Sequence, residues 1–268
     1  MDAIRVTVRR GAVVEAVHRV HVRSSAGDAL GDDFHCFFRS SLKPVQAIPL
    51  VEGYDDLDDD EIAIACASHR AEPAQLDAVR KLLARARATV DDLENGLQEG
   101  RPEGKLGHNC SGKHAGMLAA CRAHGWRLHP YRAPDHPLQR RVAELVGADE
   151  VAVDGCGVPT FAMKLSRMCG VFLRTPPRVR AAMAARPELV GGLGAADTEL
   201  MRLRPGWFAK GGAEGLCCVS DGEVAWTLKA EDGAFRAIGP ALGRLFDLDE
   251  LRSVEVRNSR GEVVGSIS

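Results

Sequence analysis

The sequence predicts an α+β fold, in which strands from both ends of the chain form one antiparallel sheet and the middle of the chain forms a helical lobe. Three observations support this prediction. β-Branched and polar residues alternate near the amino terminus, leucine and alanine recur at helical spacing in the middle, and glycine-bounded apolar segments dominate the last third. The 268 residues are 45% hydrophobic, enough to bury a sizeable core. We therefore expect a single domain over 1–268, with the sheet at about 1–30 and 205–268 and the helical lobe at about 40–200.

The first elements are two strands over 4–9 and 12–22, joined by a turn at Arg10-Gly11. Helical spacing and helix-start residues then predict a series of helices over 41–50, 61–87, 111–123, 137–145, 159–168 and 177–185.

The last third of the chain returns to strands. Three are expected within 207–233, with glycine turns at Gly211-Gly212 and Asp221-Gly222. A helix over 235–246 and two strands over 254–256 and 263–267 complete the pattern.

Composition excludes several classes of function. The 35 basic and 37 acidic residues leave a net charge of −2, so no basic excess indicates nucleic acid or an anionic membrane as partner. The longest stretch without a charged residue is about nine residues, 155–163, and spanning a bilayer takes roughly 20. No apolar signal segment is visible at the amino terminus, so we expect a cytoplasmic protein whose eight cysteines are reduced and mostly buried.

Ser40 and Lys43 form an S-x-x-K pattern at the start of a predicted helix. Residues three apart share one helix face, so the amine can reach the hydroxyl. A neutral lysine can be the base that a serine nucleophile needs, and the pattern is typical of penicillin-recognising serine enzymes. A capping serine followed by a solvent-facing lysine explains these four residues equally well.

Two later segments repeat the motif order of that superfamily. Ser68 follows the apolar segment 62–65, where it is either a positioned hydroxyl or a capping serine. Lys210 opens KGGAEG on a late strand, where the superfamily has K-T-G. The three motifs in this order favour that enzyme class more than any one of them alone.

Residues 107–116, GHNCSGKHAG, are dense in reactive side chains. The segment almost fits a phosphate-binding loop, but His114 stands where Ser or Thr is required and no strand precedes it, so we reject nucleotide binding. Cys110, Lys113 and His114 fall at i, i+3 and i+4 and would share a helix face, as metal ligands do. Thiolate and imidazole suit zinc.

The segment DGCGVPT over 154–160 is a second candidate for this site. Asp154 and Cys156 could complete a cation site with Cys110. A plain Gly-Pro turn here, and a helix start capped by Asn109 or Ser111, are the alternative interpretation.

The segments SSLKP, CASH, HNCSGKHAGML, DGCGVPTFA, KGGAEG and KAEDGAFRA together resemble the zinc-containing L-asparaginases typified by the inducible rhizobial enzyme. The resemblance extends from about residue 39 to 237. It implies a fold similar to glutaminases and serine β-lactamases, hydrolysis of L-asparagine to L-aspartate and ammonia, bound Zn²⁺, and a homodimer. The chain departs from this family in being shorter and in having Arg70-Ala71-Glu72 after CASH, where the family has small residues and glycine.

The resemblance also implies two Ser–Lys pairs for catalysis, Ser40 with Lys43 and Ser68 with Lys210. Lys229, in KAEDGAFRA, is the alternative to Lys210. Which serine attacks stays open.

Further residues match the family's binding positions. The metal ligands match Cys110, Lys113 and Cys156. The positions near the bound amino acid match Arg39, His69, Asp154 and Gly155.

Two other functions remain as alternatives. A β-lactamase-like or peptidase-like serine acyl hydrolase would turn over β-lactams or peptide esters, but such enzymes act outside the cytoplasm. A non-catalytic zinc or amino-acid binding protein would not need two Ser–Lys pairs. Ammonia release from asparagine distinguishes these possibilities.

Overall fold

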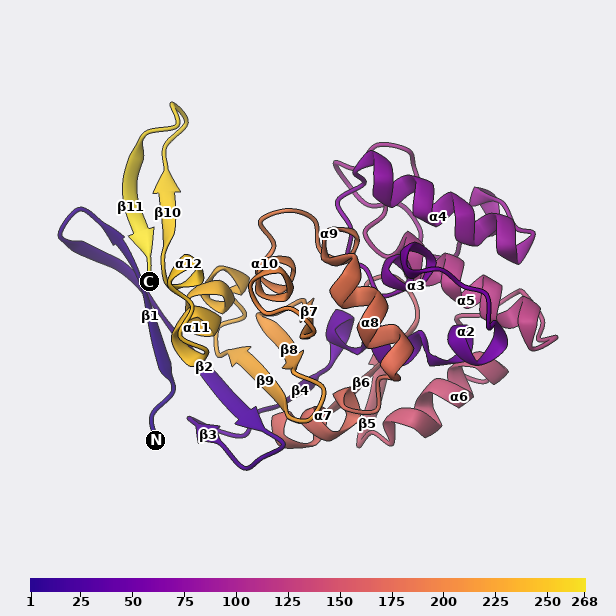
Figure 1. Ribbon diagram of the computed structural model, residues 1–268, viewed down its shortest axis with the longest axis horizontal. Coiled ribbons are helices and arrows are strands. Elements are labelled where there is room, and N and C mark those ends of the chain that lie inside the picture. Colours follow the sequence, from indigo (N-terminus) through magenta and orange to yellow (C-terminus); the bar gives the residue numbers. More distant parts are fainter.

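The two ends of the chain lie side by side in one sheet of the computed structural model, which describes residues 1–268 (Figure 1). β1 (Ile4–Arg10) pairs antiparallel with β11 (Val263–Ile267) on one side and with β2 (Val13–Ser24) on the other. The predicted α+β class, with a sheet built from both chain ends, is therefore confirmed.

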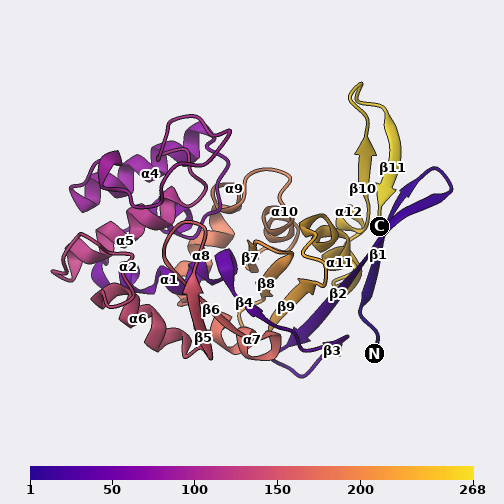
Figure 2. The ribbon, with the colours of Figure 1, turned by 180° about the vertical axis from the view of Figure 1, so that it is seen from behind.

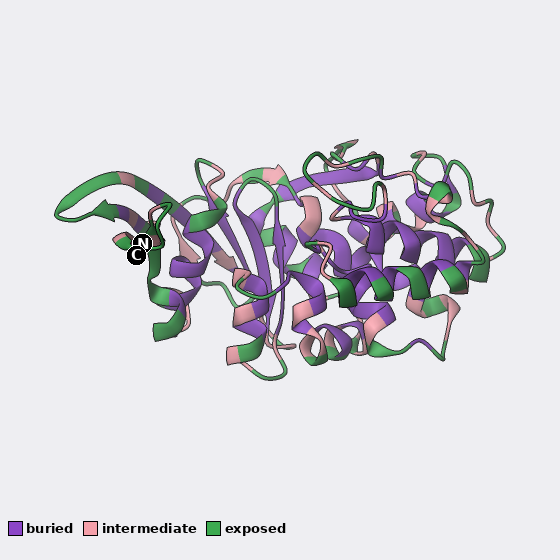
Figure 3. Ribbon diagram, turned by 90° about the horizontal axis from the view of Figure 1, so that it is seen from above, coloured by how far each residue is buried: buried purple, intermediate pink, exposed green.

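The large sheet is antiparallel, with the strand order β10-β11-β1-β2-β9-β8-β7 and the short β3 on β2. Its remaining strands are β3 (Ala29–Leu30), β7 (Phe208–Gly212), β8 (Leu216–Ser220), β9 (Ala225–Ala230) and β10 (Val254–Arg257). Every residue of β7 and β8 is buried, whereas the tip of the β1–β2 hairpin is exposed (Figure 3). The β7 edge is thus the side of the sheet that the rest of the chain covers.

Most helices of the chain occur between β4 and β7, together with the strands β5 and β6, and most of them form a lobe on the β7 side of the sheet (Figures 1 and 2). Helix α7 of this stretch packs on β9 and β2. The helices of the chain are α1 (Lys43–Gln46), α2 (Ile48–Gly53), α3 (Asp59–Ala65), α4 (Pro73–Ala86), α5 (Ser111–Ala123), α6 (Pro137–Val146), α7 (Leu165–Phe172), α8 (Pro177–Ala185), α9 (Pro187–Val190), α10 (Ala196–Leu203), α11 (Ile238–Leu245) and α12 (Asp249–Arg252), with 3₁₀ turns η1 (Arg39–Leu42), η2 (Val90–Asp92) and η3 (Phe235–Ala237). No helix combines the length and the apolar character needed to cross a membrane.

Helix α5 forms the centre of the helical lobe. It contacts α2, α3 and α4, and its residues from Ser111 to Cys121 are all buried. A helix that neighbours surround on every side needs apolar or small residues around its whole circumference. The reactive side chains of the HNCSGKH segment are therefore held inside the lobe.

The prediction of a helix over 159–168 is wrong. Residues Pro159–Lys164 form β6, and α7 begins only at Leu165. β6 lies between β4 (His35–Phe37) and β5 (Glu150–Val153) in a second, three-stranded sheet. A short buried strand and a buried helix segment have the same apolar composition, so periodicity could not separate them.

The predicted turn at Gly211-Gly212 is also wrong. Both glycines belong to β7, and the chain reverses after them, at Glu214 and Gly215, which have φ angles of 60° and 63°. Glycine is needed at 212 because a Cβ there would lie 2.7 Å from Ser41 Oγ. Ser41 is buried, and its hydroxyl donates to the Lys210 carbonyl at 2.9 Å. The sheet and the lobe therefore meet backbone to backbone, at β7 and η1.

Gly212→Ala tests this close approach. The added methyl group forces Ser41 to move, and overpacking of this kind typically lowers the free energy of unfolding by about 1–3 kcal/mol. The matched control is Gly239→Ala in α11, where a Cβ would meet only Ala196 Cβ, at 3.8 Å, and where alanine favours the helix. Chemical denaturation measures both variants, and an unchanged stability for Gly212→Ala would contradict the close approach.

Candidate active site

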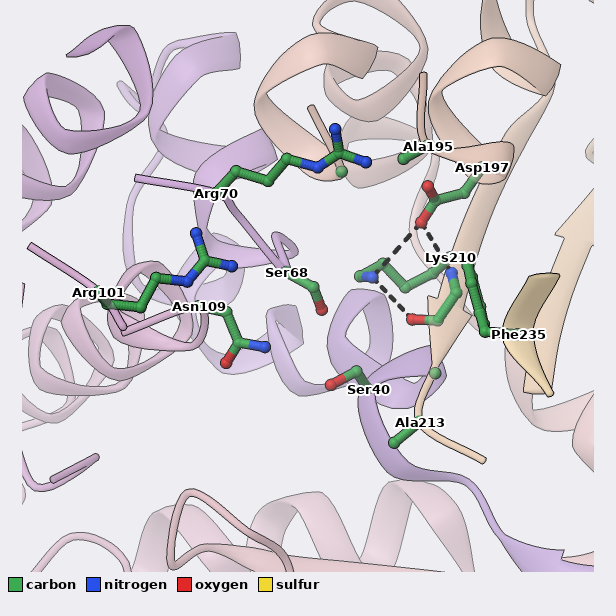
Figure 4. A pocket seen from close by; sticks show the side chains of 13 residues that line it. Ser40, Ser68, Arg70, Arg101, Asn109, Ala195, Asp197, Lys210, Ala213 and Phe235 are labelled. Atoms are coloured by element: carbon green, nitrogen blue, oxygen red, sulfur yellow. Dashed lines mark hydrogen bonds and ion pairs between the residues drawn. The ribbon is translucent and has the colours of Figure 1, made fainter. Parts of the chain in front are cut away.

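A cleft of about 280 Å³ opens where β7 meets η1 (Figure 4). Ser40 in η1, Ser68 after α3 and Lys210 in β7 all line it. The full lining is Ser40, Ser68, Arg70, Arg101, Asn109, Gly191, Ala195, Asp197, Lys210, Gly211, Gly212, Ala213 and Phe235. Three of the four side chains proposed for catalysis thus share one cleft although they are far apart in sequence.

Lys43, the fourth of these side chains, lies directly behind Ser68. It is completely buried at the start of α1, and its Nζ donates to Ser68 Oγ at 3.0 Å and to the Ala67 carbonyl. Burial lowers the pKa of Lys43 to about 8, although the nearby Cys110 sulfur acts in the opposite direction. Lys43 makes no hydrogen bond to Ser40, so the pair in contact differs from the pair that the S-x-x-K spacing suggests.

Ser68 itself is held by its backbone. Its N–H donates to the Val190 carbonyl in α9 at 2.8 Å, and the N–H of the next residue, His69, donates to the Asn109 carbonyl at 3.2 Å. These bonds tie the loop between two helical segments and present the Ser68 hydroxyl to the cleft and to Lys43.

Ser40 follows a residue in an unusual backbone conformation. Arg39 has a φ of 50°, in the left-handed backbone region that residues other than glycine seldom adopt. Its guanidinium Nε donates to Asp154 Oδ1 at 2.7 Å, and this carboxylate also accepts from the Gly155 N–H at 2.9 Å. Strain of this kind is common beside functional residues. Here the Arg39–Asp154 ion pair holds it in place.

Three residues predicted near the bound amino acid do not line the cleft. The Arg39 side chain pairs with Asp154 and borders a second cavity. The structure therefore places Arg39, Asp154 and Gly155 together, outside the lining of the cleft that holds the two serines.

His69 also lies behind the cleft wall. Its ring is buried, Nδ1 accepts from the Ala71 N–H at 3.1 Å, and Nε2 consequently donates to Ser111 Oγ at 2.8 Å. Burial lowers the pKa of His69 to about 3, so the imidazole is neutral. Its contacts join the Ser68 loop to the start of α5.

Lys210 is the lysine that accompanies the serines. Its buried Nζ donates to the Gly211 carbonyl at 2.7 Å and lies 3.5 Å from Asp197 Oδ2, which also accepts from the Gly211 N–H at 2.8 Å. It makes no direct hydrogen bond to Ser68. Lys229, the alternative, borders the second cavity and lies 5.9 Å from the centre of the Phe34 ring.

The three predicted metal ligands also converge. Lys113 Nζ donates to Cys156 Sγ at 2.9 Å, and all three of Cys110, Lys113 and Cys156 are buried. A hydrogen bond between the two sulfurs lowers the pKa of Cys110 and raises that of Cys156. Burial alone would lower the pKa of Lys113, but the two sulfurs raise it overall. His114 turns away and pairs with Tyr131 instead, its Nδ1 2.8 Å from the phenol oxygen.

This donor set fits zinc. Two sulfurs and one amine meet the preference of Zn²⁺ for sulfur and nitrogen, and three donors leave one position for a further ligand. The lysine has to give up its proton to bind the ion, as thiol ligands do. No group of three or more His, Cys, Asp or Glu side chains is arranged to hold a metal, so any site here depends on Lys113.

Sequence reasoning missed several residues of the cleft, and four of them have polar or large side chains. Asp197 lies in an ordinary helix sequence, and no signal marks it. Phe235 packs on β7, since a Cβ at Gly211 would lie 2.6 Å from its Cζ. Arg101 lies in a Gly- and Pro-rich stretch that indicates a loop and nothing more. Asn109 makes no helix cap for α5, and its side chain points into the cleft (Figure 4).

Comparisons with known proteins give one close correspondence. The family model for L-asparaginase II matches residues 6–268. No curated protein matches the chain.

Two solved structures show distant similarity to the chain. A protein assigned as a β-lactamase from Bacteroides dorei DSM 17855 has a TM-score of 0.41 at 13% identity, over 84% of each chain. A β-lactamase from Mycobacterium bovis has a TM-score of 0.32 at 15% identity, over 91% of this chain and 95% of that one.

Proposed function

Because the matching model spans nearly the whole sequence, the chain belongs to the L-asparaginase II family, and we propose that it hydrolyses L-asparagine to L-aspartate and ammonia. The family supports an amidohydrolase with a small-molecule substrate. The observation that carries the mechanism is the convergence of two serines and two lysines at one cleft.

The reaction proceeds in two steps in this proposal. A serine oxygen attacks the side-chain amide carbon, and the amide nitrogen leaves as ammonia with the proton that the serine gives up. The resulting aspartyl ester is then cleaved by water, which restores the serine and releases L-aspartate. The attacking serine is Ser40 or Ser68, because both line the cleft.

Lys43 is the base in this scheme. In its neutral form, Nζ accepts the Ser68 proton across the 3.0 Å contact, and it can still donate to the Ala67 carbonyl. A pKa of about 8 makes the neutral form available near neutral pH, as a general base requires. Attack by Ser68 is then direct, whereas attack by Ser40 uses Ser68 and Lys43 to remove the proton.

Lys210 and Asp197 position the opposite wall. Their ion pair fixes the Gly211 peptide, and because the Gly211 N–H already donates to Asp197, that group is not free to bind an oxyanion. The amides of Ser40 and Ala213 at the cleft are the remaining candidates. One such donor is typically worth about 3 kcal/mol in the transition state.

We further propose that Cys110, Lys113 and Cys156 hold Zn²⁺. The bound ion would link α5 to the loop that carries Asp154, and it would offer a water or a substrate group a Lewis acid in its open position. Its main role in this proposal is to shape the site, because the Ser–Lys groups already supply a nucleophile and a base. Thiolate ligands need reduced cysteines, which agrees with a cytoplasmic location. A homodimer is part of the proposal through the family resemblance alone.

Replacing each serine separately tests the function and assigns the nucleophile. Ser40→Ala and Ser68→Ala are each expected to reduce ammonia release from L-asparagine at least about 1,000-fold, because each removes part of one proton-transfer unit. The control is Ser253→Ala, on an exposed serine outside the cleft. Mass spectrometry of acid-quenched reactions then locates the aspartyl ester on the attacking serine. Wild-type rates in both alanine variants would contradict the mechanism, and no ammonia from zinc-loaded wild type with asparagine or glutamine would contradict the function.

The pH dependence follows from Lys43. Its neutral form is the active one, so kcat/KM should rise with pH and reach half of its plateau near pH 8. Initial rates of ammonia release between pH 6 and pH 10 measure the profile. A profile that is flat from pH 7 to pH 9 would show that Lys43 does not act as the base.

Zinc removal tests the metal proposal. Elemental analysis is expected to find bound zinc in the wild type and to find it lost in both Cys110→Ser and Cys156→Ser. The KM of each variant for asparagine should rise because the loop is released. Cys36→Ser, on a half-buried cysteine away from the three ligands, should keep the metal. Unchanged asparagine affinity in metal-free wild type would rule out the shaping role.

A further inference from the structure

Two arginines at the cleft have no acidic partner. The charged side chains of the lining are Arg70, Arg101, Lys210 and Asp197, and the last two pair with each other. Arg101 makes no side-chain hydrogen bond or ion pair. The Arg70 guanidinium has one hydrogen bond, from Nη1 to the Leu193 carbonyl at 2.8 Å, and no ion pair.

Nearby acidic groups are committed elsewhere. Glu72, two residues after Arg70, closes the amino-terminal capping box of α4 with Gln75. Elsewhere on the lobe, arginines such as Arg85 and Arg186 do have carboxylate partners within 3 Å. The cleft lining therefore holds two guanidinium groups that no carboxylate pairs with directly, although the Glu72 carboxylate lies near Arg70.

The two guanidinium groups approach the same part of the cleft. In Figure 4, Arg70 and Arg101 extend from the same wall toward the space above Ser68 and Asn109, and Lys210 lies on the opposite side. The backbone hydrogen bond to Leu193 holds the Arg70 head in this position. Guanidinium groups bind carboxylates with two parallel hydrogen bonds, which fixes the orientation of the bound anion as well as its place.

We propose that Arg70 and Arg101 form a clamp for the α-carboxylate of the substrate and so restrict the enzyme to amides that carry a free carboxylate beside the amide to be cleaved. The inference rests on the proposed asparaginase function. A carboxylate held at the clamp leaves the side-chain amide of asparagine, two carbon atoms away, directed at the serines. Arg39 cannot take this role because it is paired with Asp154 and does not line the cleft.

The experiment compares two substrates with two variants. Arg70→Met and Arg101→Met keep much of the side-chain length but remove the charge. Each is expected to raise the KM for L-asparagine about 10- to 100-fold with little change in kcat, as expected for the loss of charged hydrogen bonds to an unreacting part of the substrate. For L-aspartic acid diamide, whose α-carboxylate is replaced by an amide, the KM should not change.

Controls separate the clamp from folding. Arg140→Met removes an exposed arginine of α6 that has no ion pair, and it should leave both KM values unchanged. Arg70→Lys and Arg101→Lys retain the charge without the two-pronged geometry and should restore part of the asparagine affinity. Far-ultraviolet circular dichroism checks that each variant is folded.

The outcomes distinguish a failure of the clamp proposal from a failure of the proposed function. If the ratio of the two KM values in both methionine variants equals that of the wild type, the clamp is wrong. If the wild type releases no ammonia at all, the proposed function is wrong, and calorimetric titration with L-asparagine and with the diamide then tests the clamp directly. If the methionine variants no longer bind asparagine, the clamp is supported. If they bind it as the wild type does, the clamp is overturned.

Discussion

The close contact between β7 and η1 is the constraint on which the site depends. Strands and helices seldom approach each other backbone to backbone, because side chains usually separate them. Here Gly212 has no side chain, so the Ser41 hydroxyl reaches the Lys210 carbonyl at 2.9 Å. Ser40 precedes Ser41 in the chain, and the Lys210 side chain belongs to the residue whose carbonyl accepts this bond. The contact that joins the sheet to the lobe therefore also sets how far apart Ser40 and Lys210 lie across the cleft.

Three buried lysines around this contact are stabilised in three different ways. Lys43 has only a hydroxyl and a carbonyl as partners, and burial therefore lowers its pKa to about 8. Lys113 faces two sulfurs, which raise its pKa, and Lys210 faces the carboxylate of Asp197. A buried amine without an anionic partner is the one that most readily loses its proton. Environment alone thus distinguishes Lys43, the proposed base, from Lys113, a proposed metal ligand, and from Lys210, which pairs with a carboxylate.

The sequence predicted the fold class and several of the side chains that meet at the cleft, because both rest on local patterns. Alternation and helical spacing identify strands and helices, and the S-x-x-K, CASH, HNCSGKH and KGG segments mark the side chains that meet in the structure. Prediction from the sequence failed where one local pattern is compatible with two different structures. The segment 159–164, which is buried up to Met163, suits a strand or a helix, and Gly211-Gly212 suits a turn or a close approach. Contacts between distant elements, such as Lys43 with Ser68, have no local signature.

Arg70 and Arg101, two cleft residues that no motif marks, differ in kind from the motif residues. The motif residues are mostly buried and hold hydroxyl, amine and thiol groups at fixed distances from one another, as bond making requires. Arg70 and Arg101 lie on loops that line the cleft. At such positions the charge of the side chain matters more for binding an anion than its exact distance to the reacting atoms. Such positions can change without disturbing the buried groups. The departure at Arg70 from the family pattern thus lies at the proposed carboxylate clamp and not among the buried groups proposed for catalysis.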